Sequence, residues 1–365
     1  MKKYHLPFTL MISCIFGFTA CNDTDPKPDI ESVFSHGVFI LNEGNFSESD
    51  GSLGFLDLDS LKIRNRIFEQ VNERPFAGIL QSFRFYGGNG YLIDQLGRVE
   101  VVREEDLISV FSVSSGLDIP RYFAGHMDRG YVTDWGPYDE NFANHESKII
   151  VFDLGTMTQV NELETASRPE DILVLEDKIY VANSGADKVS VYDVSSNLLI
   201  DEVEVSMGPE RFVLDNKNNL WMICTGAYVT TGALNAINTA NDSVIVDLDL
   251  ADYSPGGPLA INGSGDVIYF LSQMYNPDFS TENTIFSVDI IYNELEPARV
   301  ELPQVVASGT NWYGIGVDPE TGILYVADAA GFLSNGRVLR YDMSGNLIDQ
   351  FDAGRGPRDF VFRKE

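Results

Sequence analysis

The feature that most constrains this chain is a four-strand unit that recurs along it. The clearest copy begins at Arg168, where Arg168–Val174 has the pattern of an inner strand. Ile179–Asn183, Lys188–Asp193 and Leu198–Val205 follow it, with polar turn residues between them. Four short strands joined by turns are typical of one blade of a β-propeller.

The same order of inner, second and third strand is found in five further places. These copies begin near Gln81, Pro120, Gly208, Gly257 and Trp312. Helical periodicity is absent from this part of the chain, which argues against an α/β fold. The repeat therefore predicts an all-β protein that folds as one propeller.

The two ends of the repeat region complement each other. Gly37–Glu43 has the pattern of a second strand with no inner strand before it, whereas Gly356–Phe362 has that of an inner strand with no blade after it. An open ring would expose two unpaired sheet edges. We therefore predict that the C-terminal strand completes the first blade and closes a seven-bladed ring, with the propeller spanning residues 37–365.

The N-terminus has the pattern of a lipoprotein signal peptide. Lys2 and Lys3 precede an apolar run, Leu6–Ala20, that is too short to span a bilayer comfortably. The run ends in small residues followed by Cys21. We predict a signal peptide over residues 1–20 and acylation of Cys21, which would fix the chain stably to a membrane because several acyl chains act together.

Residues 21–36 are acidic, contain two prolines and lack apolar periodicity, so we predict a flexible tether there. The whole chain has 25 Lys and Arg against 55 Asp and Glu, a net charge of −30. A basic surface for nucleic acid is missing, and nucleic acid is therefore excluded as an expected partner. Cys224 lies in an apolar strand pattern, and we expect a buried, inert thiol rather than a disulfide.

Motifs of common catalytic and cofactor sites are missing. The sequence has no HExxH zinc motif, no Gly-x-Ser-x-Gly nucleophile elbow and no phosphate-binding glycine loop. His36, His126 and His145 are not at the spacing of metal ligands. We predict a protein that is not an enzyme and holds no metal or cofactor, with a lactonase-like or quinoprotein-like propeller enzyme as the weaker alternative, because propellers assemble sites from distant residues.

A ligand site is expected on one face of the ring. There, the chain enters each inner strand and connects each second strand to the third. Aromatic side chains give contact area with a polar end, and Arg gives hydrogen-bond donors. The predicted ligand-binding residues are Arg121, Trp135, Tyr138, Arg211, Tyr228, Tyr275, Trp312, Tyr313 and Arg358.

Two interpretations of these positions stay open. The loop over residues 134–147, which holds Trp135 and Tyr138, is long and polar, and long loops on a rigid scaffold often carry function. By contrast, Arg121, Arg211 and Arg358, together with Glu170, are also suited to structural ion pairs around the axis.

The segment Tyr180-Val181-Ala182-Asn183, followed by Lys188–Asp193, resembles the repeat of the YVTN β-propellers. The opening segment, Val38–Phe46, is similar to the start of a branch of Bacteroidota surface lipoproteins in that group. Some members of the branch capture cobalamin and sit on a TonB-dependent transporter. The resemblance implies an outer-membrane lipoprotein at the cell surface that binds a corrinoid and passes it to such a transporter. A protein-interaction or glycan-binding propeller without catalysis is the alternative.

Overall fold

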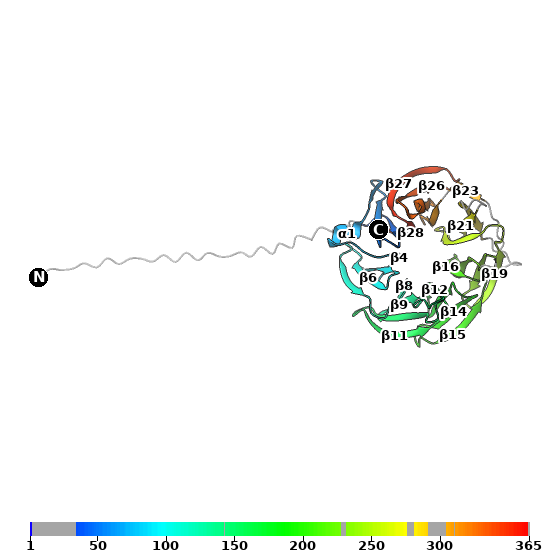
Figure 1. The fold of residues 1–365 in the computed structure, drawn as a ribbon, viewed down its shortest axis with the longest axis horizontal. Coiled ribbons are helices and arrows are strands. Elements are labelled where there is room, and N and C mark those ends of the chain that lie inside the picture. The colour runs from blue at the N-terminus through cyan, green and yellow to red at the C-terminus, as the bar shows by residue number, and fades with distance from the viewer. Residues whose placement is uncertain are drawn as a thin grey trace. The chain divides into compact units, whose positions relative to one another are not determined.

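The computed structural model describes Met1 and residues 34–141, 143–227, 231–275, 281–290, 304–309 and 311–363. The predicted signal peptide after Met1, the acylation site Cys21 and most of the predicted tether lie outside these residues. The described strands form seven four-stranded antiparallel sheets arranged in a ring (Figure 1). The prediction of an all-β, seven-bladed propeller is confirmed.

Each blade is built from an inner strand at the axis to a fourth strand at the rim. Blade 1 consists of β28 (Pro357–Arg363), β1 (Gly37–Asn42), β2 (Ser52–Asp57) and β3 (Lys62–Arg64). Blade 2 consists of β4 (Leu80–Tyr86), β5 (Asn89–Asp94), β6 (Arg98–Arg103) and β7 (Ser109–Val113). Blade 3 consists of β8 (Pro120–His126), β9 (Arg129–Asp134), β10 (Lys148–Asp153) and β11 (Thr158–Glu164).

The remaining blades repeat this order. Blade 4 consists of β12 (Pro169–Leu175), β13 (Lys178–Asn183), β14 (Lys188–Asp193) and β15 (Leu199–Glu204). Blade 5 consists of β16 (Pro209–Leu214), β17 (Asn219–Cys224), β18 (Ala233–Asn238) and β19 (Ser243–Asp249). Blade 6 consists of β20 (Pro255–Ile261), β21 (Val267–Tyr275), β22 (Thr281–Asp289) and β23 (Gln304–Gly309). Blade 7 consists of β24 (Trp312–Val317), β25 (Leu324–Asp328), β26 (Asn335–Tyr341) and β27 (Leu347–Arg355).

The ring is closed by pairing of the last strand with the first. β28 pairs antiparallel with β1 from Gly37↔Arg363 to Asn42↔Pro357. The Phe360 ring of β28 also packs against Tyr325 of blade 7, with 5.6 Å between the ring centroids. The closure predicted from the two ends of the repeat is confirmed, and the C-terminal strand belongs to both the first blade and its interface with the seventh.

Burial follows the position of a strand within its blade. Second strands are buried along almost their whole length, as in β1 and β17, because both faces of each sheet pack against neighbouring blades. Fourth strands are mostly exposed, as in β15. Tyr131, Tyr180 and Trp221 are fully buried, which confirms their expected place in the core.

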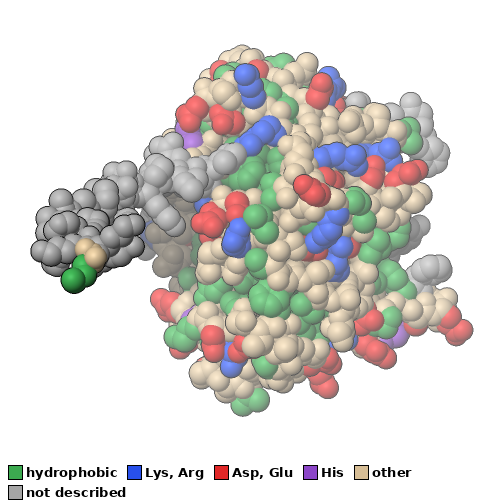
Figure 2. All heavy atoms as spheres, turned by 90° about the vertical axis from the view of Figure 1, so that its left-hand side faces the viewer, with side chains coloured by type: hydrophobic (Ala, Val, Ile, Leu, Met, Phe, Trp, Pro, Cys, Tyr) green, Lys and Arg blue, Asp and Glu red, His purple; other side chains and the backbone are tan. Residues whose placement is uncertain are grey.

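The side of the ring shown in Figure 2 exposes acidic and basic side chains interspersed among hydrophobic ones, without a large continuous patch of one charge. Fourth strands contribute exposed apolar side chains, among them Phe111, Leu199 and Ile348. Asp201 and Glu202 of β15 and Asp349 of β27 lie on the same strands as Leu199 and Ile348, and charge on an edge strand opposes pairing with other chains.

One short helix departs from the all-strand expectation. α1 (Ile67–Asn72) connects blade 1 to blade 2 and buries only Ile67 and Phe68. The Phe68 ring makes a T-shaped contact with Phe76, with 5.8 Å between the centroids. Six residues with two buried side chains are too few to produce a periodic sequence signal, so the helix was not predicted. A 3₁₀ turn, η1 (Ala330–Phe332), lies between β25 and β26.

Deletion of residues 355–365 is expected to give insoluble or aggregating protein. The deletion removes β28, leaves β1 with an unpaired edge and exposes the side chains that pack on Phe360. Solubility, size-exclusion elution and cooperativity of thermal unfolding measure the effect. Deletion of Lys364 and Glu365 alone, which follow β28, is the matched control and should leave all three unchanged. A soluble, cooperatively melting form of the longer deletion would contradict closure by β28.

Candidate functional site

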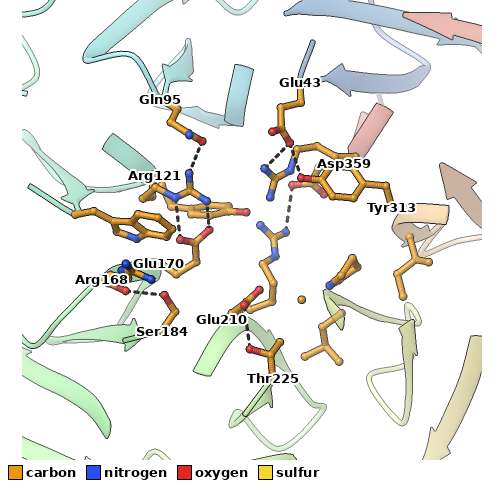
Figure 3. Close-up of a pocket in the computed structure, with 18 of the residues that line it drawn as sticks. Glu43, Gln95, Arg121, Arg168, Glu170, Ser184, Glu210, Thr225, Tyr313 and Asp359 are labelled. Atoms are coloured by element: carbon orange, nitrogen blue, oxygen red, sulfur yellow. Dashed lines mark hydrogen bonds and ion pairs between the residues drawn. The ribbon is translucent and has the colours of Figure 1, made fainter. Parts of the chain in front are cut away.

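A cavity of about 490 Å³ lies where the inner strands converge on the ring axis (Figure 3). This volume is in the range of small-molecule sites, about 300–1,000 Å³. The side chains that line it come from all seven blades. They are Glu43, Gln95, Arg121, Tyr122, Trp135, Arg168, Glu170, Ser184, Glu210, Arg211, Thr225, Gly257, Pro258, Leu259, Gln273, Tyr313, Ile315, Arg358 and Asp359.

Every inner strand has a β-bulge near its start. In β28, for example, Pro357 pairs with Asn42 and Asp359 with Leu41, which leaves Arg358 as the extra residue. Such bulges re-aim side chains and are frequent next to active sites. The bulged stretches contribute Arg358, Gln81, Arg121, Glu170, Glu210, Gly257 and Tyr313, one from each blade in ring order, and all except Gln81 line the cavity.

An ion pair between blades 3 and 4 forms one wall of the cavity. Arg121 donates through Nε and Nη2 to the two carboxylate oxygens of Glu170, both at 2.8 Å. Its Nη1 donates to Gln95 of blade 2. Gln81 donates to Glu170 Oε1 at 3.3 Å. Both charged partners are buried, and this two-point geometry with additional hydrogen bonds is what a buried pair needs to offset loss of hydration.

A second ion pair continues this network into blades 1 and 7. Arg358 Nη1 donates to Glu43 Oε2 and to Gln81 Oε1, both at 2.9 Å. The Tyr313 hydroxyl donates to the same Glu43 oxygen at 2.8 Å. Burial and the neighbouring Glu43 carboxylate raise the pKa of Tyr313 above its ordinary value, so its hydroxyl stays a donor at neutral pH.

A third ion pair, between blades 5 and 1, lies beside the first two. Arg211 Nη2 is 3.2 Å from Asp359 Oδ2, and Arg84 Nη1 is 3.5 Å from the same oxygen. The Arg211 guanidinium lies over the Tyr122 ring, 4.8 Å from its centroid. Burial by itself would raise the pKa of Asp359, but Arg211 and Arg84 outweigh it and hold that pKa below the ordinary value. Asp359 is therefore an anion at neutral pH.

Two arginines contact the ring of Trp135. The guanidinium carbon of Arg121 lies 4.2 Å from the ring centroid, and that of Arg168 lies 5.3 Å from it. Cation–π contacts of this kind favour a fixed ring orientation. The indole Nε1 is buried, and within the described residues it has no hydrogen-bond acceptor.

Glu210 differs from the other carboxylates of the cavity. The Thr225 hydroxyl donates to its Oε1 at 3.1 Å, but no Lys, Arg or His of the described residues lies at ion-pair distance from it. Burial, and then the nearby Glu170 carboxylate, raise the pKa of Glu210 from 4.5 to about 7. A Cβ atom at Gly257 would lie 1.9 Å from Glu210 Oε2, so the glycine is what allows this carboxyl to pack against the strand.

The cavity has two chemically different sides. The bulges of blades 1 to 5 carry the charged and amide side chains described above. Blades 6 and 7 contribute Pro258, Leu259 and Ile315 to the lining, together with Gln273 and Tyr313. The charged sector therefore faces a wall with apolar surface, an arrangement typical of sites for small organic molecules.

Five of the nine predicted ligand-binding residues meet in the cavity: Arg121, Trp135, Arg211, Tyr313 and Arg358. Trp312 lines only a smaller neighbouring cavity of about 140 Å³ and is 5% exposed, packed on Tyr341 in the core. Tyr138 is 47% exposed and does not line the central cavity. Tyr228 and the side chain of Tyr275 lie outside the described part of the structure.

The alternative of structural ion pairs is also realised, because Arg121, Arg211 and Arg358 each pair with a carboxylate. These pairs form the cavity wall itself. The sequence prediction missed Glu43, Gln95, Glu210 and Asp359. Glu210 and Asp359 follow a strand-initiating proline by one and two residues, the same offsets as Arg121 and Asp171, and comparison of these positions between the repeats would have found them.

Together, the fold and the cavity define a seven-bladed β-propeller with an axial site of ligand size. The chain belongs to the family described as "Domain of unknown function (DUF5074)", which matches residues 36–358. No curated protein matches the sequence. The YVTN type and the cobalamin-capturing branch stay predictions.

Solved structures share the fold at low sequence identity. A quinonprotein alcohol dehydrogenase-like protein from Bacteroides thetaiotaomicron is 14% identical with a TM-score of 0.65, over 90% of this chain and 78% of that one. A functionally unknown protein from Desulfotomaculum acetoxidans is 12% identical with a TM-score of 0.63, over 90% and 99%. Hydrazine synthase from Kuenenia stuttgartiensis is 16% identical with a TM-score of 0.60, over 74% and 85%. These likenesses establish the propeller fold alone.

The described residues contain no group of three or more His, Cys, Asp or Glu side chains arranged to hold a metal ion. None of their helices is long and apolar enough to cross a membrane.

Replacing Glu210 with Gln is expected to change stability in a pH-dependent way. The folded protein holds a proton on Glu210 up to about pH 7, whereas an unfolded chain releases it near 4.5. The wild type therefore loses stability as pH rises from about 4.5 to 7, and Glu210→Gln does not share this loss. At pH 8 we expect the variant to be more stable by about 1–3 kcal/mol, and at pH 4 to differ little.

Denaturant unfolding at pH 4, 6 and 8 measures this difference. Glu204→Gln, at an exposed position of β15, is the control and should show no comparable pH dependence. If Glu210→Gln were less stable than the wild type at pH 8, the carboxylate would have to be stabilised by its surroundings, contrary to the raised pKa.

Proposed function

We propose that this protein is a non-catalytic binding protein that captures a small molecule in the axial cavity. The observation that carries the proposal is the convergence of seven bulged inner strands on one cavity with a charged sector and an apolar wall. Cation–π pairs and ion pairs hold the arginines of this sector in place before any ligand arrives. Preorganised groups favour binding because little freedom is lost on association.

A corrinoid is the ligand that the sequence resemblance favours. Amide groups rim a corrin ring, and its periphery therefore presents many carbonyl acceptors. The cavity offers Arg and Trp donors to such acceptors. At about 490 Å³, the cavity would receive only an edge of so large a molecule, with the remainder lying across the mouth.

The predicted acylation of Cys21 would place this binding protein on a membrane, and the resemblance favours the outer membrane at the cell surface. In that setting the propeller would pass its ligand to a TonB-dependent transporter. No covalent chemistry is needed for such a transfer, because the ligand only moves between two binding sites. The propeller therefore requires no catalytic residue in this role.

Calorimetric titration of the purified protein with cyanocobalamin tests the ligand class. We expect saturable one-to-one binding. Trp135→Ala should weaken it by more than about 1 kcal/mol, since this ring is fixed in the cavity wall between two arginines. Tyr138→Ala is the matched control, because this residue lies in the same loop but outside the cavity, and its affinity should be unchanged.

The remaining arms of the titration separate the alternatives. A mixture of monosaccharides and haem are titrated in the same way. Binding of a sugar in place of cyanocobalamin would favour the glycan-binding alternative. No binding in any arm would contradict small-molecule capture and favour a protein-interaction role. Trp312→Ala should act through folding, seen as a lower melting temperature, because this side chain is part of the core.

A further inference from the structure

Two hydrogen-bond donors on residues that line the cavity lack acceptors within the described structure. Two buried side-chain atoms without a partner in the described structure belong to lining residues, and both are nitrogens: Arg211 Nη1 and Trp135 Nε1. The carboxylate and amide oxygens of the described residues that lack a partner lie elsewhere, on Asn65, Glu69, Glu100 and Asn197. A buried donor without an acceptor destabilises the fold, so a ligand that brings acceptors to these two donors would be favoured.

The charged groups of the cavity also favour a ligand that carries hydrogen-bond acceptors and negative charge. All four of its cations are arginines, whose planar donor fork suits carboxylates better than the ammonium group of lysine. Of its four carboxylates, Glu43, Glu170 and Asp359 are neutralised by arginines. Glu210 is the remaining one, and below about pH 7, where it is mostly protonated, the four arginines of the lining outnumber its three ionised carboxylates.

The apolar side limits what else the ligand contains. Pro258, Leu259 and Ile315 provide contact for a hydrocarbon or aromatic body, opposite the arginine sector. Burial of such a body against these side chains favours binding in proportion to the apolar surface removed from water. A bare inorganic anion would leave this wall unused.

We infer that the cavity binds an organic acid: its carboxylate accepts hydrogen bonds from Arg211 and Trp135, and its apolar body lies against Pro258, Leu259 and Ile315. The inference rests on the proposed capture of a small molecule, and it selects a carboxylate in place of the amide-rimmed corrinoid that the sequence resemblance favours.

A bound carboxylate is linked to protonation of Glu210. The charged groups around Glu210 are Glu170 of β12, Arg121 of β8 and Arg358 of β28. Its neighbour Cys224, at the end of β17, has a thiol whose pKa is raised by burial and which stays neutral. A second anion in the cavity disfavours ionised Glu210, so the ligand binds best when this acid is protonated. Affinity should therefore fall as pH rises through about 7.

A matched pair of probes tests the inference: naphthalene-2-carboxylate and its neutral amide, naphthalene-2-carboxamide. They have the same shape, and only the first is an anion. By calorimetry at pH 6 we expect the carboxylate to bind at least tenfold more tightly than the amide. Between pH 6 and pH 8 its affinity should fall about tenfold, the change that follows from protonation of one group with a pKa near 7.

Three variants attribute the effect to named groups. Trp135→Phe keeps the aromatic ring and removes only the N–H, and it should weaken carboxylate binding about fivefold or more. Arg211→Gln should abolish the preference for the carboxylate over the amide. Glu210→Gln should keep the preference and lose the pH dependence. Melting temperatures show that each variant is folded, and Trp135→Phe keeps the test available if Arg211→Gln does not fold.

The outcomes separate this inference from the proposed function. Equal binding of the two probes, tighter binding of the amide, or no binding of the carboxylate would overturn the organic-acid inference, even if cyanocobalamin binds. Carboxylate binding that depends on Arg211 and Trp135 would support it, even if cyanocobalamin does not bind.

Discussion

The pairing of β28 with β1 is the constraint on which the rest of the structure depends. In a propeller whose first blade lacks its inner strand, that blade has an unpaired sheet edge, and its interface with the last blade is incomplete. β28 supplies both the hydrogen bonds to β1 and the aromatic side chains that pack on Tyr325 of blade 7. The same strand carries Arg358 and Asp359 to the axis. Closing the ring and completing the cavity are therefore one event, and the cavity forms only once the two ends of the chain have met.

The bulges explain how a repeated strand pattern yields a site without repeated chemistry. An ordinary inner strand would alternate its side chains between the two neighbouring blades. The extra residue near the start of six inner strands, and the two extra residues in β20, break that alternation and add a bulge position at the axis. This position lies outside the hydrophobic clusters that fix the other strand residues. It therefore tolerates arginine in blade 3, glutamate in blades 4 and 5 and glycine in blade 6 without loss of the fold.

The sequence was sufficient for the fold because strand alternation, turn residues and the complementary ends are all local signals. It placed Arg121, Arg211 and Arg358 in the site for the same reason, since each lies just after a proline that begins a strand. It could not show that Arg358 meets Glu43 or that Arg211 meets Asp359, because these partners are far apart in the chain and adjacent only in a closed ring. The sequence could not show that Trp312 is buried, because its burial depends on Tyr341 of a distant strand in the same blade and on Ile285 of blade 6.

Folding stability does not explain why charged and polar side chains line the axial cavity. Buried ion pairs seldom contribute more than well-packed apolar residues of the same size. Blades 6 and 7 show that this chain does place Pro, Leu and Ile at the axis. Six blades nevertheless contribute charged or amide groups to the cavity, two of its donors lack acceptors among the described residues, and Glu210 has a carboxyl whose ionised form is disfavoured. The unpaired donors and the disfavoured carboxylate cost folding free energy. Under the proposed function, a ligand that supplies acceptor atoms offsets this cost, and the ligand-bound propeller is the state for which this arrangement of charges is favourable.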